Sequence, residues 1–186
     1  MHSVNLIQRR VDNELLRQNR GRWVLLAHNH VPLFPNHTIE YLRELTYGTY
    51  QLYLSPSYIQ DTLMRNEADE DEEDQALQID LNTNELGFIR IRLYSRFRNA
   101  TRHQLWISYN QEYVENQEVD GNEPILGYYC TCKAGARTLG TCSHVAAVLW
   151  FLGWARNQDA VKYHSTELLR NIIDARNIND NPVDCN

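Results

Sequence analysis

Four metal-binding side chains within fifteen residues constrain this chain more than any other feature: Cys130-x-Cys132, nine residues, then Cys142-x-His144. Three thiols and one imidazole form a ligand set of structural zinc sites, in which four protein side chains surround the ion tetrahedrally. Calcium and magnesium prefer oxygen ligands, so thiolates argue against both ions. The pattern therefore predicts one zinc ion held by Cys130, Cys132, Cys142 and His144.

The residues around the first two cysteines predict the end of a strand followed by a loop. Tyr128 and Tyr129 lead into Cys130, and side chains in a strand alternate with a period of two, so Cys130 and Cys132 would point to the same side. Glycines in the following loop allow the chain to turn sharply before the second pair of ligands. Both sulfur atoms could then face one ion.

The second pair of ligands is predicted to lie at the start of a helix. Ser143 suits the N-cap position, so the helix would begin at His144 and run through Trp154. Cys142 would come just before that helix, where backbone N–H groups and the positive end of the helix dipole stabilise a thiolate. Strand end, loop and helix start would thus bring the four ligands to one point.

Two other interpretations of these residues stay open. The cysteines could form disulfides, although Cys130 and Cys132 are too close in sequence to pair easily and no secretory signal precedes them. The thiols could also be ordinary buried side chains, with His144 at the helix start by accident. The fourth cysteine, Cys185, has no neighbour that repeats the ligand spacing and is interpreted as a spare thiol.

The Cys-x-Cys and Cys-x-His pairs before an apolar helix resemble the SWIM-type zinc finger, and the four ligands occupy that family's four positions. Longer segments resemble the C-terminal region of transposon-encoded proteins found in arthropods, in which a SWIM finger follows a DDE-type transposase core. The resemblance covers most of residues 4–157. The segments are LTYGTYQLYLSPSYIQ at 45–60, IRIRLYSRFRN at 89–99, LWISYN at 105–110 and YYCTCKAGARTLGTCSHVAAVLWFLGWAR at 128–156.

The resemblance implies a non-catalytic tail of a transposon-derived protein that binds nucleic acid, DNA in particular, in the nucleus of the cell. The residues themselves give no sign of an enzyme. A zinc deaminase would need an acid beside the histidine ligand and a CxxC pair, whereas this chain has Val145 and CxC. With four protein ligands the zinc shell is closed, so we expect a structural rather than a catalytic ion.

An acidic run dominates the net charge of the chain. Residues 67–74, EADEDEED, carry seven acids and no base, so the rest of the chain has a formal charge of +1 although the whole has −6. Such a run is typical of a solvated linker. The chain has no run of 18 apolar residues and no apolar signal-peptide core after Met1, so we expect an intracellular, reducing environment and no membrane partner.

The predicted fold class is α+β, with a helical N-terminal segment, the acidic linker, and then a small antiparallel sheet with one helix stabilised by zinc. The sheet would comprise residues 86–132, and the helix 144–154 would cover its apolar face. The predicted organisation is a mainly helical accessory region at 1–65, a linker at 66–83, a SWIM-type zinc-finger domain at 84–157 and a tail at 158–186.

Several features of the accessory region stay open at this level. Helical spacing of Val4, Ile7, Val11 and Leu15 predicts a first helix that Gly21 can end. Residues 23–27 can extend this helix or form a strand, and Thr38 can cap a second helix that ends near Gly48. Tyr50, Leu52 and Leu54 alternate with polar residues, which favours a short strand before Pro56, with a helix from 57 to 64 after it. His28, His30 and His37 invite a second metal site, but no cysteine or acidic ligand accompanies them.

Two kinds of partner are consistent with the sequence, and neither is a small-molecule substrate. Arginine outnumbers lysine 16 to 2, and its planar group suits phosphates and base edges. The alternative is a protein–protein interaction module with a purely structural zinc, whose surface would include Trp150, Trp154 and Tyr163. The candidate nucleic-acid-binding residues are Arg90, Arg92, Arg96, Arg98, Arg102, Lys133 and Arg137.

Overall fold

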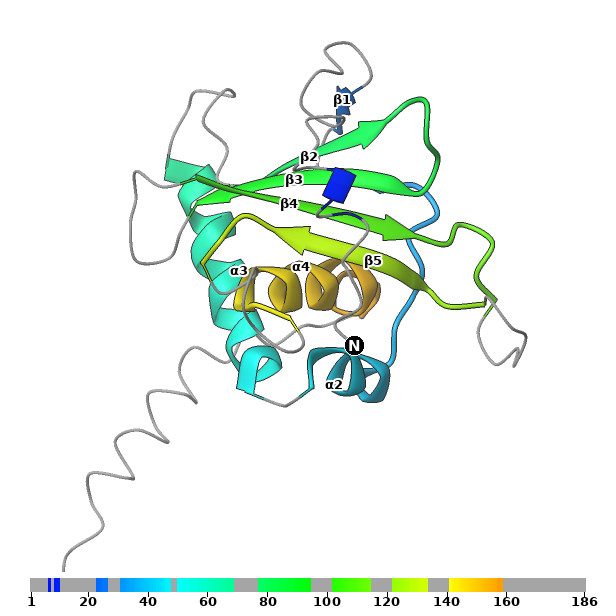
Figure 1. Cartoon of the computed structure of the whole chain (residues 1–186). Coiled ribbons are helices and arrows are strands. Elements are labelled where there is room, and N and C mark those ends of the chain that lie inside the picture. The colour runs from blue at the N-terminus through cyan, green and yellow to red at the C-terminus, as the bar shows by residue number, and fades with distance from the viewer. Residues whose placement is uncertain are drawn as a thin grey trace, which may run out of the picture.

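A five-stranded antiparallel sheet forms the centre of the computed structural model (Figure 1). Each strand pairs with the next one along the chain, in the order β1-β2-β3-β4-β5. The strands are β1 (Trp23–Leu25), β2 (Leu77–Asn82), β3 (Phe88–Tyr94), β4 (Arg102–Tyr109) and β5 (Ile125–Cys130). The structure describes residues 7, 9–10, 23–26, 31–47, 50–68, 77–94, 102–114, 122–133 and 141–158.

Helices cover one face of this sheet (Figure 1). They are α2 (Ile39–Thr46), α3 (Tyr50–Ala68) and α4 (Ser143–Gly153), and a short 3-10 helix, η3 (Ala155–Asn157), follows α4. The sheet face beneath them is apolar because alternate residues of the central strands are aliphatic, such as Ile89, Ile91 and Leu93 on β3. These side chains are excluded from water together with Val148 and Leu149 of α4. Their burial is the main driving force for joining helices and sheet.

The helices of the predicted accessory region belong to this same core. Leu42 of α2 and Leu52 and Ile59 of α3 are buried in one cluster with Leu105 of β4 and Leu152 of α4. The α+β class and the sheet-plus-helix arrangement are thus confirmed. The sheet is larger than predicted, because β1 and β2 add two strands to it. The residues around the metal ligands share one hydrophobic core with α2 and α3 and do not form a separate core.

Strand β2 corrects the predicted extent of the acidic linker. Residues 77–82 form a strand, although the acidic composition predicts that they belong to the linker at 66–83. The sequence does not predict this strand because Asp80 continues the acidic composition of the preceding run. Leu77 and Ile79 alternate with polar residues as a strand requires, and both are fully buried.

Strand β1 resolves the alternatives for residues 23–27. Trp23–Leu25 form an edge strand that pairs with β2. Of the first predicted helix, the described residues are Ile7, Arg9 and Arg10, and their backbone is helical. The tail beyond Gln158 lies outside the described residues, and so do His28 and His30.

The second predicted helix is confirmed, whereas the short strand predicted before Pro56 is wrong. Thr38 caps α2 through its hydroxyl oxygen, which accepts a hydrogen bond from the N–H of Tyr41 at 3.1 Å. Residues 50–54 belong to α3, which continues through Pro56. Proline removes one helical hydrogen bond, but Ser55 follows Leu52 at helical spacing and both face the core. Tertiary burial therefore outweighs the local preference.

Candidate metal centre

The four predicted ligands come together at the end of β5 and the start of α4. Cys130 is the last residue of β5, and Cys132 follows two positions later. Cys142 is the N-cap of α4, and His144 lies in its first turn. The sulfur atoms and the imidazole nitrogen all lie within 4.8 Å of one another. All three of these cysteines are buried, and none of them is in a disulfide.

The Cys-x-Cys pair is held in strand-like geometry by the residue between the two cysteines. The N–H of Thr131 donates to the carbonyl of Gln104 at 3.0 Å, and the Thr131 hydroxyl accepts from the N–H of Gln104 at 3.0 Å. These bonds extend the β4–β5 ladder beyond Cys130. The two flanking sulfur atoms consequently project to the same side, as the period of two predicts.

The helix begins one residue earlier than predicted. Ser143 is its first residue, and Cys142 has the extended backbone (φ −77°, ψ 165°) of an N-cap. The helix ends at Gly153, with Trp154 as its C-cap. The reason for the shift is that the carbonyl of Cys142 already accepts the first helical hydrogen bond, from the N–H of Ala146 at 3.0 Å. A thiol at this position faces the positive end of the helix dipole.

The spacing of the four atoms fits a metal ion. Nδ1 of His144 lies 3.9 Å from Sγ of Cys130 and 3.9 Å from Sγ of Cys142. Tetrahedral zinc, with bonds of about 2.3 Å to sulfur and about 2.0 Å to nitrogen, places such ligand atoms about 3.6 Å apart. Small side-chain movements would reach this spacing. The cluster could therefore hold a single metal ion, and its donor chemistry favours zinc.

The raised pKa values of two of the clustered thiols also favour binding of a cation. Hydrogen bonding to Cys132 and then to Cys142, followed by burial, raises the pKa of Cys130 far above its ordinary value. For Cys142, hydrogen bonding to Cys130 lowers the pKa, but Cys132 and burial outweigh it and raise the pKa to about 11. Three buried thiolates are thus unfavourable without a compensating charge. A divalent ion supplies that charge and keeps its thiol ligands deprotonated.

Two aromatic residues contact His144 that the sequence does not predict near the metal centre. The ring of His103 lies 4.6 Å from the His144 ring, centroid to centroid, and the ring of Tyr58 lies 5.5 Å away, edge-on. Burial, with the charge of His144 second, lowers the pKa of His103. Strand β4 lies beside the metal ligands because Leu105 pairs with Cys130 of β5. The register between β4 and β5 cannot be predicted from one sequence, so the position of His103 could not be predicted either.

The third histidine of the N-terminal group lies elsewhere in the fold. His37 is buried, and its backbone N–H donates to the carbonyl of Gly153 at the end of α4, at 2.7 Å. Burial lowers its pKa to about 4. Among the described residues, His37 belongs to no group of three or more side chains that could hold a metal ion.

The candidate nucleic-acid-binding arginines on β3 pair with an acid. Nε of Arg90 donates to Oδ2 of Asp80 at 2.9 Å, and Nη2 of Arg92 donates to Oδ1 at 3.0 Å. The guanidinium of Arg90 also lies 4.7 Å from the centre of the Trp23 ring. Asp80 is buried. Both arginines are thus paired within the protein, and the single charge of Asp80 balances one of their two positive charges.

Other basic candidates lie near the metal-centre end of the sheet. Arg102 begins β4, Lys133 follows Cys132, and both side chains are exposed. Arg96 and Arg98 belong to the connection between β3 and β4, and Arg137 to the connection between Lys133 and α4. These three lie outside the described residues. The structure thus brings the four metal ligands together. Of the seven basic candidates it describes four: Arg90 and Arg92 pair with Asp80, and Arg102 and Lys133 are exposed.

No helix in the described part of the chain is both long and apolar enough to cross a membrane. Comparison with models of known protein families, with curated proteins and with solved structures found no match to this chain. The likeness to the SWIM-type finger therefore rests on the Cys3His pattern, and the transposon origin stays a prediction.

Proposed function

We propose that Cys130, Cys132, Cys142 and His144 bind one structural zinc ion and that the chain is a non-catalytic, zinc-stabilised binding module. The observation that carries this proposal is the convergence of four donor atoms within 4.8 Å of one another. When bound, zinc supplies a positive charge that keeps the thiols ionised. Four protein donors fill a tetrahedral shell, so no position is left for an activated water.

The consequence of binding is local. The ligands connect the end of β5 to the first turn of α4, so the ion would fix the approach of this helix to the sheet. The rest of α4 is held by core side chains such as Val148 and Leu149, which are almost completely buried. Removal of the metal is therefore expected to loosen residues 130–144 first and to lower overall stability, rather than to detach α4.

The test compares the wild-type chain with a ligand variant and a matched cysteine control. Cys142→Ser removes one ligand, whereas Cys185→Ser removes the thiol that lies outside the ligand spacing. Purified proteins are analysed for zinc by elemental analysis and native mass spectrometry, and cobalt is added as a spectroscopic probe. We expect one zinc per chain and tetrahedral thiolate–cobalt absorption in the wild type and in Cys185→Ser. A full complement of zinc in Cys142→Ser would refute the assignment.

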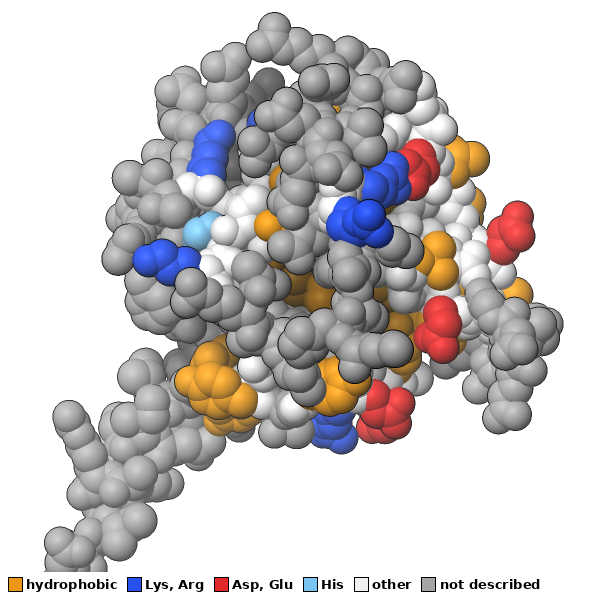
Figure 2. All heavy atoms as spheres, viewed as in Figure 1, with side chains coloured by type: hydrophobic (Ala, Val, Ile, Leu, Met, Phe, Trp, Pro, Cys, Tyr) orange, Lys and Arg blue, Asp and Glu red, His pale blue; other side chains and the backbone are white. Residues whose placement is uncertain are grey.

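We further propose that the metal-centre end of the sheet contacts nucleic acid. Support comes from the exposed side chains of Arg102 and Lys133, on chain segments that the hydrogen bonds between Gln104 and Thr131 hold together. Among the described side chains on the face seen in Figure 2, some cationic ones lie next to each other beside an acidic one, and the other cationic side chains lie apart from them. A compact contact near the metal centre is thus better supported than a broad basic surface.

Binding of labelled single-stranded and double-stranded DNA and of RNA, followed by fluorescence anisotropy at several salt concentrations, tests this second proposal. The double variant Arg102→Ala/Lys133→Ala should bind several-fold more weakly and show a shallower salt dependence, because fewer counterions are released. Arg9→Ala/Arg43→Ala, which removes two exposed arginines elsewhere in the chain, is the control for the same change of net charge. Equal affinity of the wild type and the double variant would exclude this contact site.

A further inference from the structure

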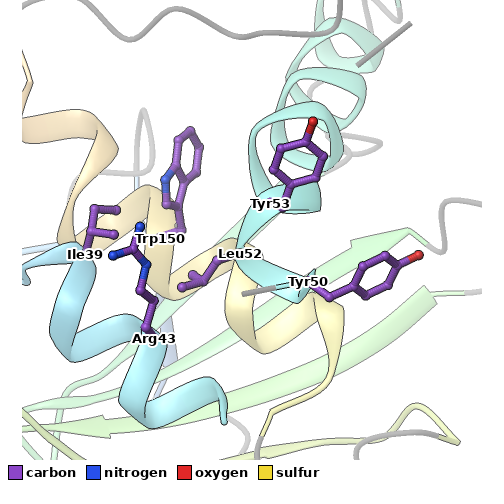
Figure 3. A pocket seen from close by; sticks show the side chains of 6 residues that line it. All are labelled: Ile39, Arg43, Tyr50, Leu52, Tyr53 and Trp150. Carbon is purple, nitrogen blue, oxygen red and sulfur yellow. The ribbon is translucent and has the colours of Figure 1, made fainter. Parts of the chain in front are cut away.

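A groove unrelated to the metal ligands lies where α2, α3 and α4 meet (Figure 3). Its volume is about 440 Å³, within the range of about 300–1,000 Å³ that is typical of ligand sites. Helix α2 forms one wall, the start of α3 forms the other, and α4 contributes to the floor. The lining side chains are Ile39, Arg43, Tyr50, Leu52, Tyr53 and Trp150.

The groove combines a buried apolar floor with aromatic rings that are open to water. Leu52 and Trp150 are 8% and 4% exposed, whereas Tyr50 and Tyr53 are 71% and 52% exposed. Tyrosine and tryptophan are enriched at protein interfaces, where they contribute large contact areas. Because two lining rings are mostly exposed, the groove suits a segment of chain better than a small molecule that needs enclosure.

One cation sets the charge of the groove. In Figure 3, the guanidinium of Arg43 points toward the floor residue Trp150. Its ion pair with Glu40 is long, at 3.6 Å, and both side chains are largely exposed, so this pair contributes little to stability. Arg43 can therefore accept a better-placed carboxylate, since guanidinium groups bind carboxylates through two parallel hydrogen bonds.

Two acidic residues of α2 restrict the class of ligand whose carboxylate can bind Arg43. Glu40 and Glu44 are both exposed and lie on the same helix as Arg43, one turn apart. A polyanion such as nucleic acid would meet both of these charges, whereas a single carboxylate can reach Arg43 alone. The charge pattern therefore favours a peptide with one acidic side chain over a nucleic acid.

We propose that this groove binds a short peptide segment of a partner protein, with an apolar side chain over Leu52 and Trp150 and a neighbouring carboxylate on Arg43. The exposed rings of Tyr50 and Tyr53 would pack along the peptide. The contact area is small, so the interaction would be weak and transient. The inference does not depend on nucleic-acid binding, because it uses a different surface.

The experiment selects phage-displayed random twelve-residue peptides on the zinc-loaded full chain and measures the enriched peptides by fluorescence anisotropy. We expect a consensus with an apolar residue within two positions of Asp or Glu. Arg43→Glu and Tyr50→Ala should each weaken binding about tenfold, since a charge-assisted hydrogen bond or an aromatic contact is lost. Arg9→Glu, at an exposed arginine that does not line the groove, makes the same charge change as Arg43→Glu and is the matched control, which should bind like the wild type.

A second comparison tests the pairing itself. Replacing the acid of the selected peptide by its amide should weaken binding to the wild type, with no further loss for Arg43→Ala, because both changes remove the same contact. Arg43 and Tyr50 are exposed, so the variants should unfold at the wild-type urea midpoint. The proposal fails if no peptide is enriched, if the consensus lacks an acid, if Arg43→Glu and Tyr50→Ala bind normally, or if single-stranded DNA displaces the peptide.

Discussion

The buried ring of His37 makes a specific prediction about pH and stability. It packs against the end of α4, so closely that a Cβ atom on Gly153 would lie 2.0 Å from Cδ2 of His37. The rings of Phe34 and Tyr41 lie 5.7 and 5.1 Å away. Neither ring nitrogen has a hydrogen-bond partner among the described residues. Burial accordingly lowers the pKa of His37 from 6.5 to about 4.

The sign and size of the effect follow from proton linkage. Below pH 6.5 the unfolded chain binds a proton at this histidine, whereas the folded chain stays neutral until about pH 4. The unfolded state therefore binds more protons in this window, and the free energy of unfolding falls as the pH is lowered. The difference of about 2.5 pKa units, at about 1.4 kcal/mol per unit, amounts to about 3 kcal/mol. Above pH 6.5 the contribution is constant.

Urea unfolding of the wild type and of His37→Phe at roughly pH 7 and pH 4.5 measures this contribution. Phenylalanine keeps an aromatic ring but cannot take up a proton. Between these two pH values the wild type should lose about 2.5 kcal/mol more than the variant. Loss of zinc in acid affects both proteins and cancels in the comparison. Equal losses in the two proteins would refute the reasoning.

Two further predictions concern the sheet. Asp80→Asn should lower the free energy of unfolding by about 2–3 kcal/mol, because Arg90 and Arg92 would lose their shared carboxylate; the figure is below that of a fully buried pair since both arginines are partly solvated. An unchanged urea midpoint would show that the ion pairs contribute nothing. Gly87→Ala should cost about 3 kcal/mol in the same assay, because Gly87 has φ +75° and the new Cβ would lie 2.3 Å from the carbonyl oxygen of Tyr109. A wild-type midpoint in that variant would contradict the required backbone conformation.

Features that depend on neighbouring residues could be predicted from the sequence. The four metal ligands are confined to residues 130–144, and their spacing alone indicated that they converge. The cap at Thr38 and the alternation in residues 88–94 are also local patterns, and both correspond to observed elements.

Features that depend on pairing between distant residues could not be predicted. Strand β2 joins the sheet through its register with β1 and β3, and Asp80 meets Arg90 only in that register. His103 lies beside the metal centre because β4 pairs with β5. A single sequence gives periodicity but not register. It therefore assigns Asp80 to the linker and Arg90 and Arg92 to a nucleic-acid-binding surface, and does not reveal that the arginines pair with Asp80.

The closeness of the four ligands along the chain has a consequence for how metal affects folding. Closing a loop of this length costs little entropy, and the cost rises only slowly with length. The unfolded chain can therefore already capture the ion, before strands such as β1 and β2 find partners that are more than fifty residues apart in sequence. Metal that binds the unfolded chain stabilises it too, so the ion's net effect on folding is smaller than its affinity for the native site. Zinc would then act early, as an organiser of residues 130–144 around which the remaining sheet assembles.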